Sequence, residues 1–205
     1  MIILQKLQGF KTDMKNVREE IAQSIATKQA ILDNDEILAK IEQAAQIMTQ
    51  AYRNGHSALL AGNGGSAADA QHLAGELVNQ FYFARPGIPA HSLSTDTSVM
   101  TAIGNDIGYK YLFSRQIEAQ GTKGDVFIGI STSGNSENII EALKTCRAKG
   151  ITSIGFTGCR PCKMDDLADL CIKVPSDCTP RIQESHILIG HIICAIVEEN
   201  LFGQK

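Results

Sequence analysis

A glycine-dense turn decides how this chain folds, because Ala61-Gly62-Asn63-Gly64-Gly65-Ser66 follows a short apolar run and leads directly into an alanine-rich helical pattern. Glycines lack the Cβ that would keep backbone N–H groups from turning inward. The first turn of the following helix adds unpaired donors and a partial positive charge. This arrangement is typical of an anion site, and we expect it to bind a phosphate.

A second loop of the same kind occurs later in the chain. The apolar run 125–130 leads into Ser131-Thr132-Ser133-Gly134-Asn135-Ser136, and a helical pattern follows through Lys149. This loop adds side-chain hydroxyl groups to the backbone donors. Two such loops in one small chain indicate a phosphorylated small molecule as the ligand.

Size and composition describe a globular protein of ordinary domain size. The chain has 205 residues, of which 43% are hydrophobic and 20% charged, and its formal net charge is -3. This charge gives no electrostatic reason to expect nucleic acid or an anionic membrane surface as a partner. We expect no spanning helix, because no segment reaches roughly 18 apolar residues, and no signal peptide, because Lys6 follows the apolar start too closely. A cytoplasmic location is the resulting expectation.

The six cysteines are expected to be reduced, because several lie in apolar or helical runs where a thiol packs as a small hydrophobic group. Cys159 and Cys162 have the C-x-x-C spacing of redox and zinc pairs. Neither a second pair nor a thioredoxin-like helix near the N-terminus accompanies them. We therefore expect a loop here and keep a redox or zinc pair as the alternative.

Strand and helix patterns alternate after Gly55, which predicts a parallel sheet with helices on both faces, a three-layer α/β fold. Two helices are expected before it, within residues 13–54. We divide the single expected domain, 1–205, into a helical arm, 1–54, and an α/β core, 55–205. The expected strands are 57–61, 90–94, 125–130, 151–156 and 170–174. The expected helices of the core are 66–82, 96–104, 109–120, 136–149, 163–168 and 181–201.

Ligands bind such sheets beyond the carboxyl ends of the strands, near the topological switch point, and both loops lie at that end. A dinucleotide is one alternative guest, because Gly62, Gly64 and Ala67 formally fit its glycine fingerprint. That fingerprint also requires an acidic residue about twenty positions later, where this chain has Arg85-Pro86-Gly87. We therefore favour a monophosphate.

His72 and Glu76 lie four residues apart on the helix that the glycine turn opens, so they share one face of it. Glu76 follows that turn by about ten residues, or roughly 15 Å of helix, which is about the length of an extended sugar phosphate. A solvated pair on an outer face is the alternative. We favour a functional pair because the neighbouring positions are apolar, namely Ala68, Ala70, Leu73, Ala74 and Leu77.

The last expected helix carries Gln183, Glu184, His186 and His191 within an otherwise apolar stretch. Such a helix is buried on most sides, and polar groups inside it need partners or a task. Gln183 and His191 are separated by roughly 12 Å along a regular helix and by about 80° around it. For both to face one small site, we expect either an irregular first turn or a site shared by two subunits.

Four stretches carry a family pattern: Gly62–His72, Gly104–Asp106, Ile130–Ser136 and Arg181–His186. Together they resemble the bacterial sedoheptulose 7-phosphate isomerases, members of the sugar isomerase (SIS) fold family, over nearly the whole chain. The resemblance implies an SIS-type, flavodoxin-like fold and an aldose/ketose isomerase. Its reaction would convert sedoheptulose 7-phosphate to D-glycero-D-manno-heptose 7-phosphate, on the route to lipopolysaccharide core heptose. It also implies a homotetramer with active sites between subunits.

Position by position, the resemblance implies that the phosphate is bound by Ser131, Thr132, Ser133 and Ser136. It implies that the sugar is held by Asn63, Gly64, Gly65, Ser66, Glu76, Asn105, Asp106 and Gln183. In some members zinc is bound by residues that match His72, Glu76, Gln183 and His191. The acid/base pair of the family matches Glu76 and His191. Pro180 departs from the pattern, because some members have an aspartate there, so one substrate contact is lost or supplied otherwise.

Moving a carbonyl between adjacent carbons requires a base for the α-proton and a donor or Lewis acid for the developing enediolate oxygen. Glu76 is the expected base and His191 the expected partner in proton transfer. Zinc, one ion per subunit, would polarise the carbonyl. Because a zinc-bound carboxylate is a weaker base, either Glu76 changes its coordination during turnover or the ion is present for only part of the cycle.

The same fold family offers a non-catalytic alternative, a protein that binds the bacterial replication initiator or senses a sugar phosphate. By resemblance, the initiator-binding relative keeps the glycine and serine loops but lacks counterparts of Glu76 and His191. This chain has both residues, which favours an enzyme.

The expected arm and the terminal helix carry more apolar surface than one three-layer domain of this size needs, which indicates a closed symmetric assembly. The residues concerned are Ile21, Ile25, Ile31, Leu32, Ile37, Ile41, Ile187, Leu188, Ile192, Ile193 and Ile196. If two subunits share each site, mixing Glu76→Gln chains with His191→Ala chains should restore some activity.

Overall fold

The computed structural model describes residues 16–203, and within them helices and strands follow in the expected order. The expected helical start at residue 13 and the apolar start of the chain lie outside the described residues. The strands are β1 (Ala58–Gly62), β2 (Ala90–Ser92), β3 (Val126–Ile130), β4 (Thr152–Thr157) and β5 (Leu170–Lys173). The helices are α2 (Val17–Leu32), α3 (Asp35–Arg53), α4 (Gly65–Val78), α5 (Thr97–Asp106), α6 (Leu112–Gln120), α7 (Glu137–Lys149), α8 (Met164–Leu167) and α9 (Thr179–Phe202), with a 3-10 turn η1 (Tyr109–Tyr111).

The five strands form one parallel sheet in the order β2-β1-β3-β4-β5, which confirms the parallel sheet expected from the alternation. This is the flavodoxin-like order, and its switch point lies between β1 and β3. Gly62, at the end of β1, is in register with Ile130, at the end of β3. The loops that follow these two strands therefore emerge side by side.

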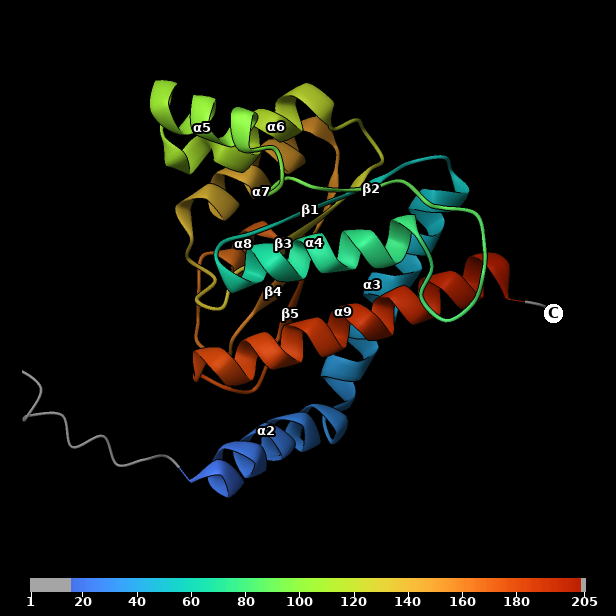
Figure 1. The fold of residues 1–205 in the computed structure, drawn as a ribbon, viewed down its shortest axis with the longest axis vertical. Coiled ribbons are helices and arrows are strands. Elements are labelled where there is room, and N and C mark those ends of the chain that lie inside the picture. Colours follow the sequence, from blue (N-terminus) through green and yellow to red (C-terminus); the bar gives the residue numbers. More distant parts are fainter. Residues whose placement is uncertain (1–15, 204–205) are drawn as a thin grey trace, which may run out of the picture.

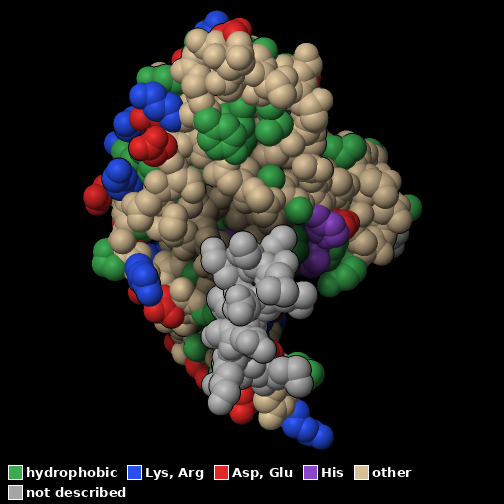
Figure 2. Space-filling model, turned by 60° about the vertical axis from the view of Figure 1, so that its left-hand side comes forward, with side chains coloured by type: hydrophobic (Ala, Val, Ile, Leu, Met, Phe, Trp, Pro, Cys, Tyr) green, Lys and Arg blue, Asp and Glu red, His purple; other side chains and the backbone are tan. Residues whose placement is uncertain are grey.

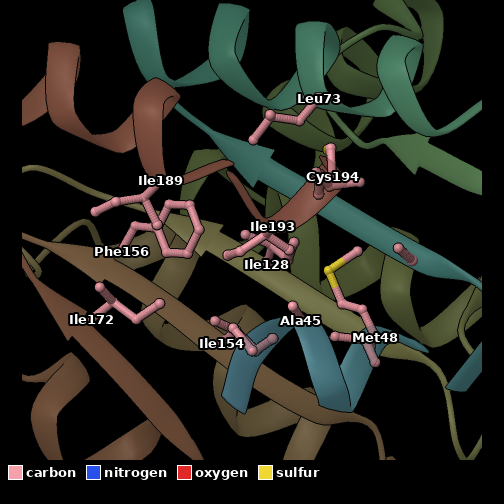
Figure 3. Packing of buried hydrophobic residues seen from close by; sticks show 14 of the residues in the cluster. Ala45, Met48, Leu73, Ile128, Ile154, Phe156, Ile172, Ile189, Ile193 and Cys194 are labelled. Carbon is pink, nitrogen blue, oxygen red and sulfur yellow. The ribbon is translucent and has the colours of Figure 1, made fainter. Parts of the chain in front are cut away.

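Helices cover both faces of the sheet, as the fully buried residues of β1 and β3 require (Figure 1). One core cluster joins α3, α4 and α9 to one face, and a second joins α6, α7 and α8 to the other. Figure 3 shows the first cluster, in which Met48 of α3, Leu73 of α4 and Ile193 of α9 contribute to the packing. The second expected N-terminal helix, α3, therefore packs against the sheet.

Two helix boundaries differ from the expectation for physical reasons. The helix α4 ends at Val78 rather than at residue 82, because the N–H groups of Phe81 and Tyr82 donate to Glu198 instead of continuing the helix. The helix α9 begins at Thr179 rather than at residue 181, because Pro180 is tolerated in the first helical turn. The expected helix 109–120 is divided into η1 and α6.

No spanning helix was expected, because no segment looked apolar enough, yet one described helix has the composition of a membrane span. By length and composition, α9 would pass for one, since it has 24 residues and a mean hydropathy of 1.3 over its most apolar window. Of that window, 44% is buried inside the protein. Core helices of globular proteins can have the same length and hydropathy as a membrane span. The packing of α9 against α3 and α4 is that of such a core helix.

His186 of α9 gives a testable dependence of stability on pH. The residue is fully buried, and burial lowers its pKa from 6.5 to about 4, although the Thr157 carbonyl 3.2 Å from Nε2 opposes this shift. Between these values the unfolded chain binds a proton that the folded chain excludes, so stability falls as the pH falls. We expect His186→Gln to flatten this acid limb by up to about 3 kcal/mol between pH values of about 6.5 and 4. Urea unfolding of metal-free protein measures the difference, and an acid limb as steep in the variant as in the wild type would contradict it.

Candidate functional site

The glycine turn after β1 has the shape that the sequence predicts. A Cβ at Gly62 would overlap the carbonyl oxygen of Ser66, and Gly64 has φ +56°, in the left-handed region that favours glycine. Gly64 is also the residue before the first turn of α4. Ser66 itself is buried, so its place is in the packing of this turn.

Asn63 connects this turn to the neighbouring elements. Its amide exchanges two hydrogen bonds with the amide of Asn138 in α7, at 2.9 Å and 2.8 Å, and its Oδ1 accepts one from the Tyr109 hydroxyl at 2.9 Å. Tyr109 closely follows Asn105 and Asp106, which lie exposed at the end of α5 and hydrogen bond to each other. The sequence did not single out Asn138 or Tyr109, because neither belongs to a recognisable pattern.

The serine loop gathers three hydroxyl groups at the N-terminus of α7. Ser131 Oγ lies 2.9 Å from Ser136 Oγ and 3.4 Å from Ser133 Oγ. Ser136 is the N-cap residue of α7, yet its side chain makes no capping hydrogen bond. The hydroxyls and the unpaired N–H groups of the first helical turn are together suited to bind a phosphate.

A second group of polar side chains converges where α4 lies against α9. His72 Nε2 lies 2.8 Å from His191 Nε2 and 3.3 Å from Glu76 Oε1. One ligand atom from each of the three residues lies within 4.8 Å of the others, and we call them the His72/Glu76/His191 cluster. The cluster is accessible, since the His72 side chain is 49% exposed and the Glu76 side chain 25%. Figure 2 shows histidine surface beside an acidic side chain on one face of the molecule.

The surroundings of His191 favour its neutral imidazole form. Burial lowers its pKa, the neighbouring His72 lowers it further, and Glu76 opposes these effects. Its ring also contacts Phe81, with a centroid separation of 5.4 Å. A neutral ring nitrogen can accept a proton or bind a metal ion, whereas a protonated one can do neither.

The donor set fits a metal ion. Two imidazole nitrogens and one carboxylate oxygen form the three-ligand set of several catalytic zinc sites, which leave one position open for water or substrate. The expected fourth ligand, Gln183, lies elsewhere, because its amide packs against Gly65 at the beginning of α4.

Both Gln183 and His191 lie against α4 because α4 and α9 run alongside each other (Figure 1). Gly190 of α9 packs on Leu73, one position from His72. The helix α9 is continuous from Thr179 to Phe202. Within one chain, a regular α9 therefore places Gln183 and His191 at separate positions along α4 and not in one small site, as the helix geometry predicted.

Asp69 is a further polar residue on α4 that the sequence did not single out. It is half-buried, its Oδ2 has no hydrogen-bond partner among the described residues, and burial raises its pKa to about 6, against the effect of His72. It lines a surface hollow with Pro180, Gln183 and Gly65. Pro180 thus lies beside Gln183, at the position where the family pattern has an aspartate in some members.

The C-x-x-C pair lies in the loop between β4 and α8, where a loop was expected. Cys159 is exposed and Cys162 half-buried, and both sulfurs are free thiols. Cys162 packs against Gly134 of the serine loop. The pair therefore borders the expected phosphate site rather than the His72/Glu76/His191 cluster.

Comparisons with known proteins agree with this geometry. The sequence profile of the SIS domain matches residues 14–158. Phosphoheptose isomerase 2 of Campylobacter jejuni is 61% identical over 188 residues, which cover 92% of this chain and 94% of that protein. The phosphoheptose isomerase of Aneurinibacillus thermoaerophilus is also 61% identical, over 92% of this chain and 96% of the relative.

A solved structure extends the likeness to three dimensions. The phosphoheptose isomerase of Neisseria gonorrhoeae superposes with a TM-score of 0.84 at 41% identity, over 89% of this chain and 97% of that chain. A glycine turn, a serine loop, the 2-1-3-4-5 parallel sheet and these relatives lead to the same assignment. The chain belongs to the SIS-domain family and, within it, to the phosphoheptose isomerases.

Proposed function

We propose that the protein interconverts sedoheptulose 7-phosphate and D-glycero-D-manno-heptose 7-phosphate. The observation that carries the proposal is the His72/Glu76/His191 cluster, which α9 completes on α4, the helix that begins at the glycine turn. The serine loop with its converging hydroxyls follows the neighbouring strand. One end of this surface is suited to a phosphate and the other to proton transfer. Because the ligand is a phosphorylated metabolite, a cytoplasmic location is part of the proposal.

In the proposed complex the phosphate lies at the N-terminus of α7, bound by Ser131, Thr132, Ser133 and Ser136. The sugar extends over the glycine turn toward the cluster. Its hydroxyl groups are held by Asn63, Gly64, Gly65, Asn105, Asp106 and Gln183. Ser66 supports the turn from inside, because it is buried. Asn63 is well suited to orient a sugar hydroxyl, since its amide is fixed by Asn138 and Tyr109.

Glu76 is proposed to remove the proton from C1 of the ketose and to return it to C2 of the aldose. His191, kept neutral by burial, moves the proton between the two oxygens. Zinc, held by His72, Glu76 and His191, would supply a Lewis acid for the carbonyl oxygen. Gln183, whose amide lies against Gly65, is proposed to hold the sugar and not the ion. The ring of Phe81 lies beside that of His191, with a centroid separation of 5.4 Å.

Ligand-induced thermal stabilisation tests the ligand class. We expect sedoheptulose 7-phosphate to raise Tm more than sedoheptulose or NAD at equal concentration, because the hydroxyl cluster matches a single phosphate. Stabilisation at 100 times Kd is about 2.7 kcal/mol, which is easily measured in a melting curve. Ser133→Ala should weaken the response to the phosphorylated sugar. Equal stabilisation by NAD would contradict the monophosphate assignment.

We also propose a homotetramer. The exposed apolar residues of α2 support an assembly, since Val17 is 72% exposed, Ile21 55%, Ile25 61% and Leu32 61%. Ile31, Ile37, Ile41 and Ile193, which we had also expected at an interface, are buried within the chain instead. We expect light scattering to give a tetramer and Ile21→Glu combined with Ile25→Glu to dissociate it. A monomeric wild type would refute the assembly.

The cluster geometry reverses the expected result of mixing inactive chains. Glu76 and His191 approach each other within one chain, so a site that has lost either residue cannot regain it from a neighbouring subunit. We expect mixed Glu76→Gln and His191→Ala chains to show no activity beyond that of the separate variants. Recovery near a quarter of the wild-type rate would show that the residues act across a subunit boundary.

A further inference from the structure

A buried ion pair lies behind the His72/Glu76/His191 cluster and has no part in the proposed chemistry. Arg85 Nε lies 3.0 Å from Glu198 Oε1, and the two side chains are only 2% and 1% exposed. Glu198 is on α9, seven residues after His191, and Arg85 is on the segment that leaves α4. Removing two charges from water is costly, so a buried pair adds little net stability compared with apolar residues of the same size.

The guanidinium of Arg85 holds the end of α4. Its Nη2 donates to the carbonyl of Glu76 at 2.8 Å, and its Nη1 donates to the carbonyl of Leu77 at 2.7 Å. The carbonyls of a last helical turn lack partners within the helix. Arg85 therefore fixes the backbone of the residue that carries the proposed base.

The carboxylate of Glu198 holds the other side of the cluster. Its two oxygens accept hydrogen bonds from the N–H groups of Phe81 and Tyr82, at 2.7 Å and 2.6 Å. Burial alone would raise its pKa, but these two donors and Arg85 lower it overall, so Glu198 is ionised. Phe81, anchored in this way, contacts the imidazole of His191.

We propose that the Arg85–Glu198 pair is a positioning device, which sets Glu76 through its carbonyl and His191 through Phe81 and thereby fixes the spacing of the two helices that carry the cluster. Neither residue reaches the three cluster atoms, so both act only through others. The expected effect on kcat rests on the proposed function. The expected effect on the positions of Glu76 and His191 does not. A displacement of about 1 Å in a reacting group can reduce a rate about 100-fold.

Two conservative variants and one matched control test the proposal. Arg85→Lys keeps the charge but replaces the three nitrogens that donate to Glu198, Leu77 and Glu76 by a single one, and Glu198→Gln keeps the shape. Asp125→Asn is the control, because Asp125 is also a buried carboxylate that accepts two backbone N–H bonds, from Ser57 and Thr122, but at the opposite end of the strands. All three should lower Tm. If Glu198→Gln does not fold, Arg85→Lys carries the test.

For the folded Arg85→Lys variant we expect kcat to fall about 10- to 100-fold and KM to change less than about threefold. Zn²⁺ affinity should fall about 10-fold or more, as for groups that orient metal ligands, and the ring-proton NMR signals of His191 in metal-free protein should shift. Asp125→Asn should change none of these. Wild-type kcat, Zn²⁺ affinity and His191 signals in folded Arg85→Lys would overturn the proposal. If the wild-type chain does not act on the sugar phosphate, the proposed function fails, while Zn²⁺ affinity and the His191 signals still decide the positioning claim.

Discussion

Replacing Glu76 by glutamine should lower kcat for sedoheptulose 7-phosphate by about 10² to 10⁴, the range for a positioned general base. The glutamine amide has nearly the shape of the carboxylate but cannot accept a proton from carbon. The Glu76 side chain is one quarter exposed, and within residues 16–203 its ion pair is the i,i+4 contact with His72, so folding should change little. Steady-state kinetics and melting curves measure both effects.

A matched control separates loss of the base from loss of a surface charge. Glu42→Gln makes the same chemical change at an exposed position of α3 and should leave kcat unchanged. Phosphate binding should survive in Glu76→Gln, because the serine loop lies between β3 and α7, whereas Glu76 is on α4. Near-normal turnover in that variant would rule out Glu76 as the base.

If zinc acts as proposed, chelation should abolish most of the activity, and in His191→Ala added Zn²⁺ should not restore it. Groups that only hydrogen bond to a metal ligand already contribute about 10- to 100-fold in metal affinity, so loss of a direct ligand should lower Zn²⁺ affinity by at least about 100-fold. The result is expected because the cluster offers only three donor atoms from histidine and carboxylate side chains. Chelation, metal analysis and titration with Zn²⁺ measure it.

His91→Ala is the control for a change of histidine as such, because His91 is exposed on β2 and lies outside the cluster. Its Zn²⁺ affinity and activity should match the wild type. Full activity of metal-free wild-type enzyme would remove zinc from the mechanism, while leaving Glu76 and His191 as the proposed acid/base pair.

Local patterns were sufficient to predict the sheet and the two loops. The spacing of apolar residues that distinguishes strands from helices repeats within a few residues. The glycine turn is confined to Gly62–Gly65, where close packing and a positive φ exclude other residue types. The parallel arrangement followed because successive strands were separated by helices. The end of α4 was missed because Glu198, more than 100 residues away in the sequence, draws the chain out of the helix.

The residues of the candidate site could be predicted from the sequence, but the contacts between those that lie far apart in the sequence could not. His72 and Glu76 share a helix face by spacing alone, yet His191 joins them over 119 residues through the packing of α4 on α9. Tyr109 reaches Asn63 over 46 residues, and Arg85 reaches Glu198 over 113. Contacts of this length depend on the fold as a whole, so no local pattern indicates them.

Direct observation of the reaction tests the central claim. Zinc-loaded protein is incubated with sedoheptulose 7-phosphate in D₂O, and the products are followed by NMR. We expect D-glycero-D-manno-heptose 7-phosphate to form with deuterium at C2, because the proton held by Glu76 exchanges with solvent before it is returned. Glu76→Gln should slow product formation and exchange alike, by about 10² or more. The absence of conversion by zinc-loaded wild-type protein would contradict the proposed function.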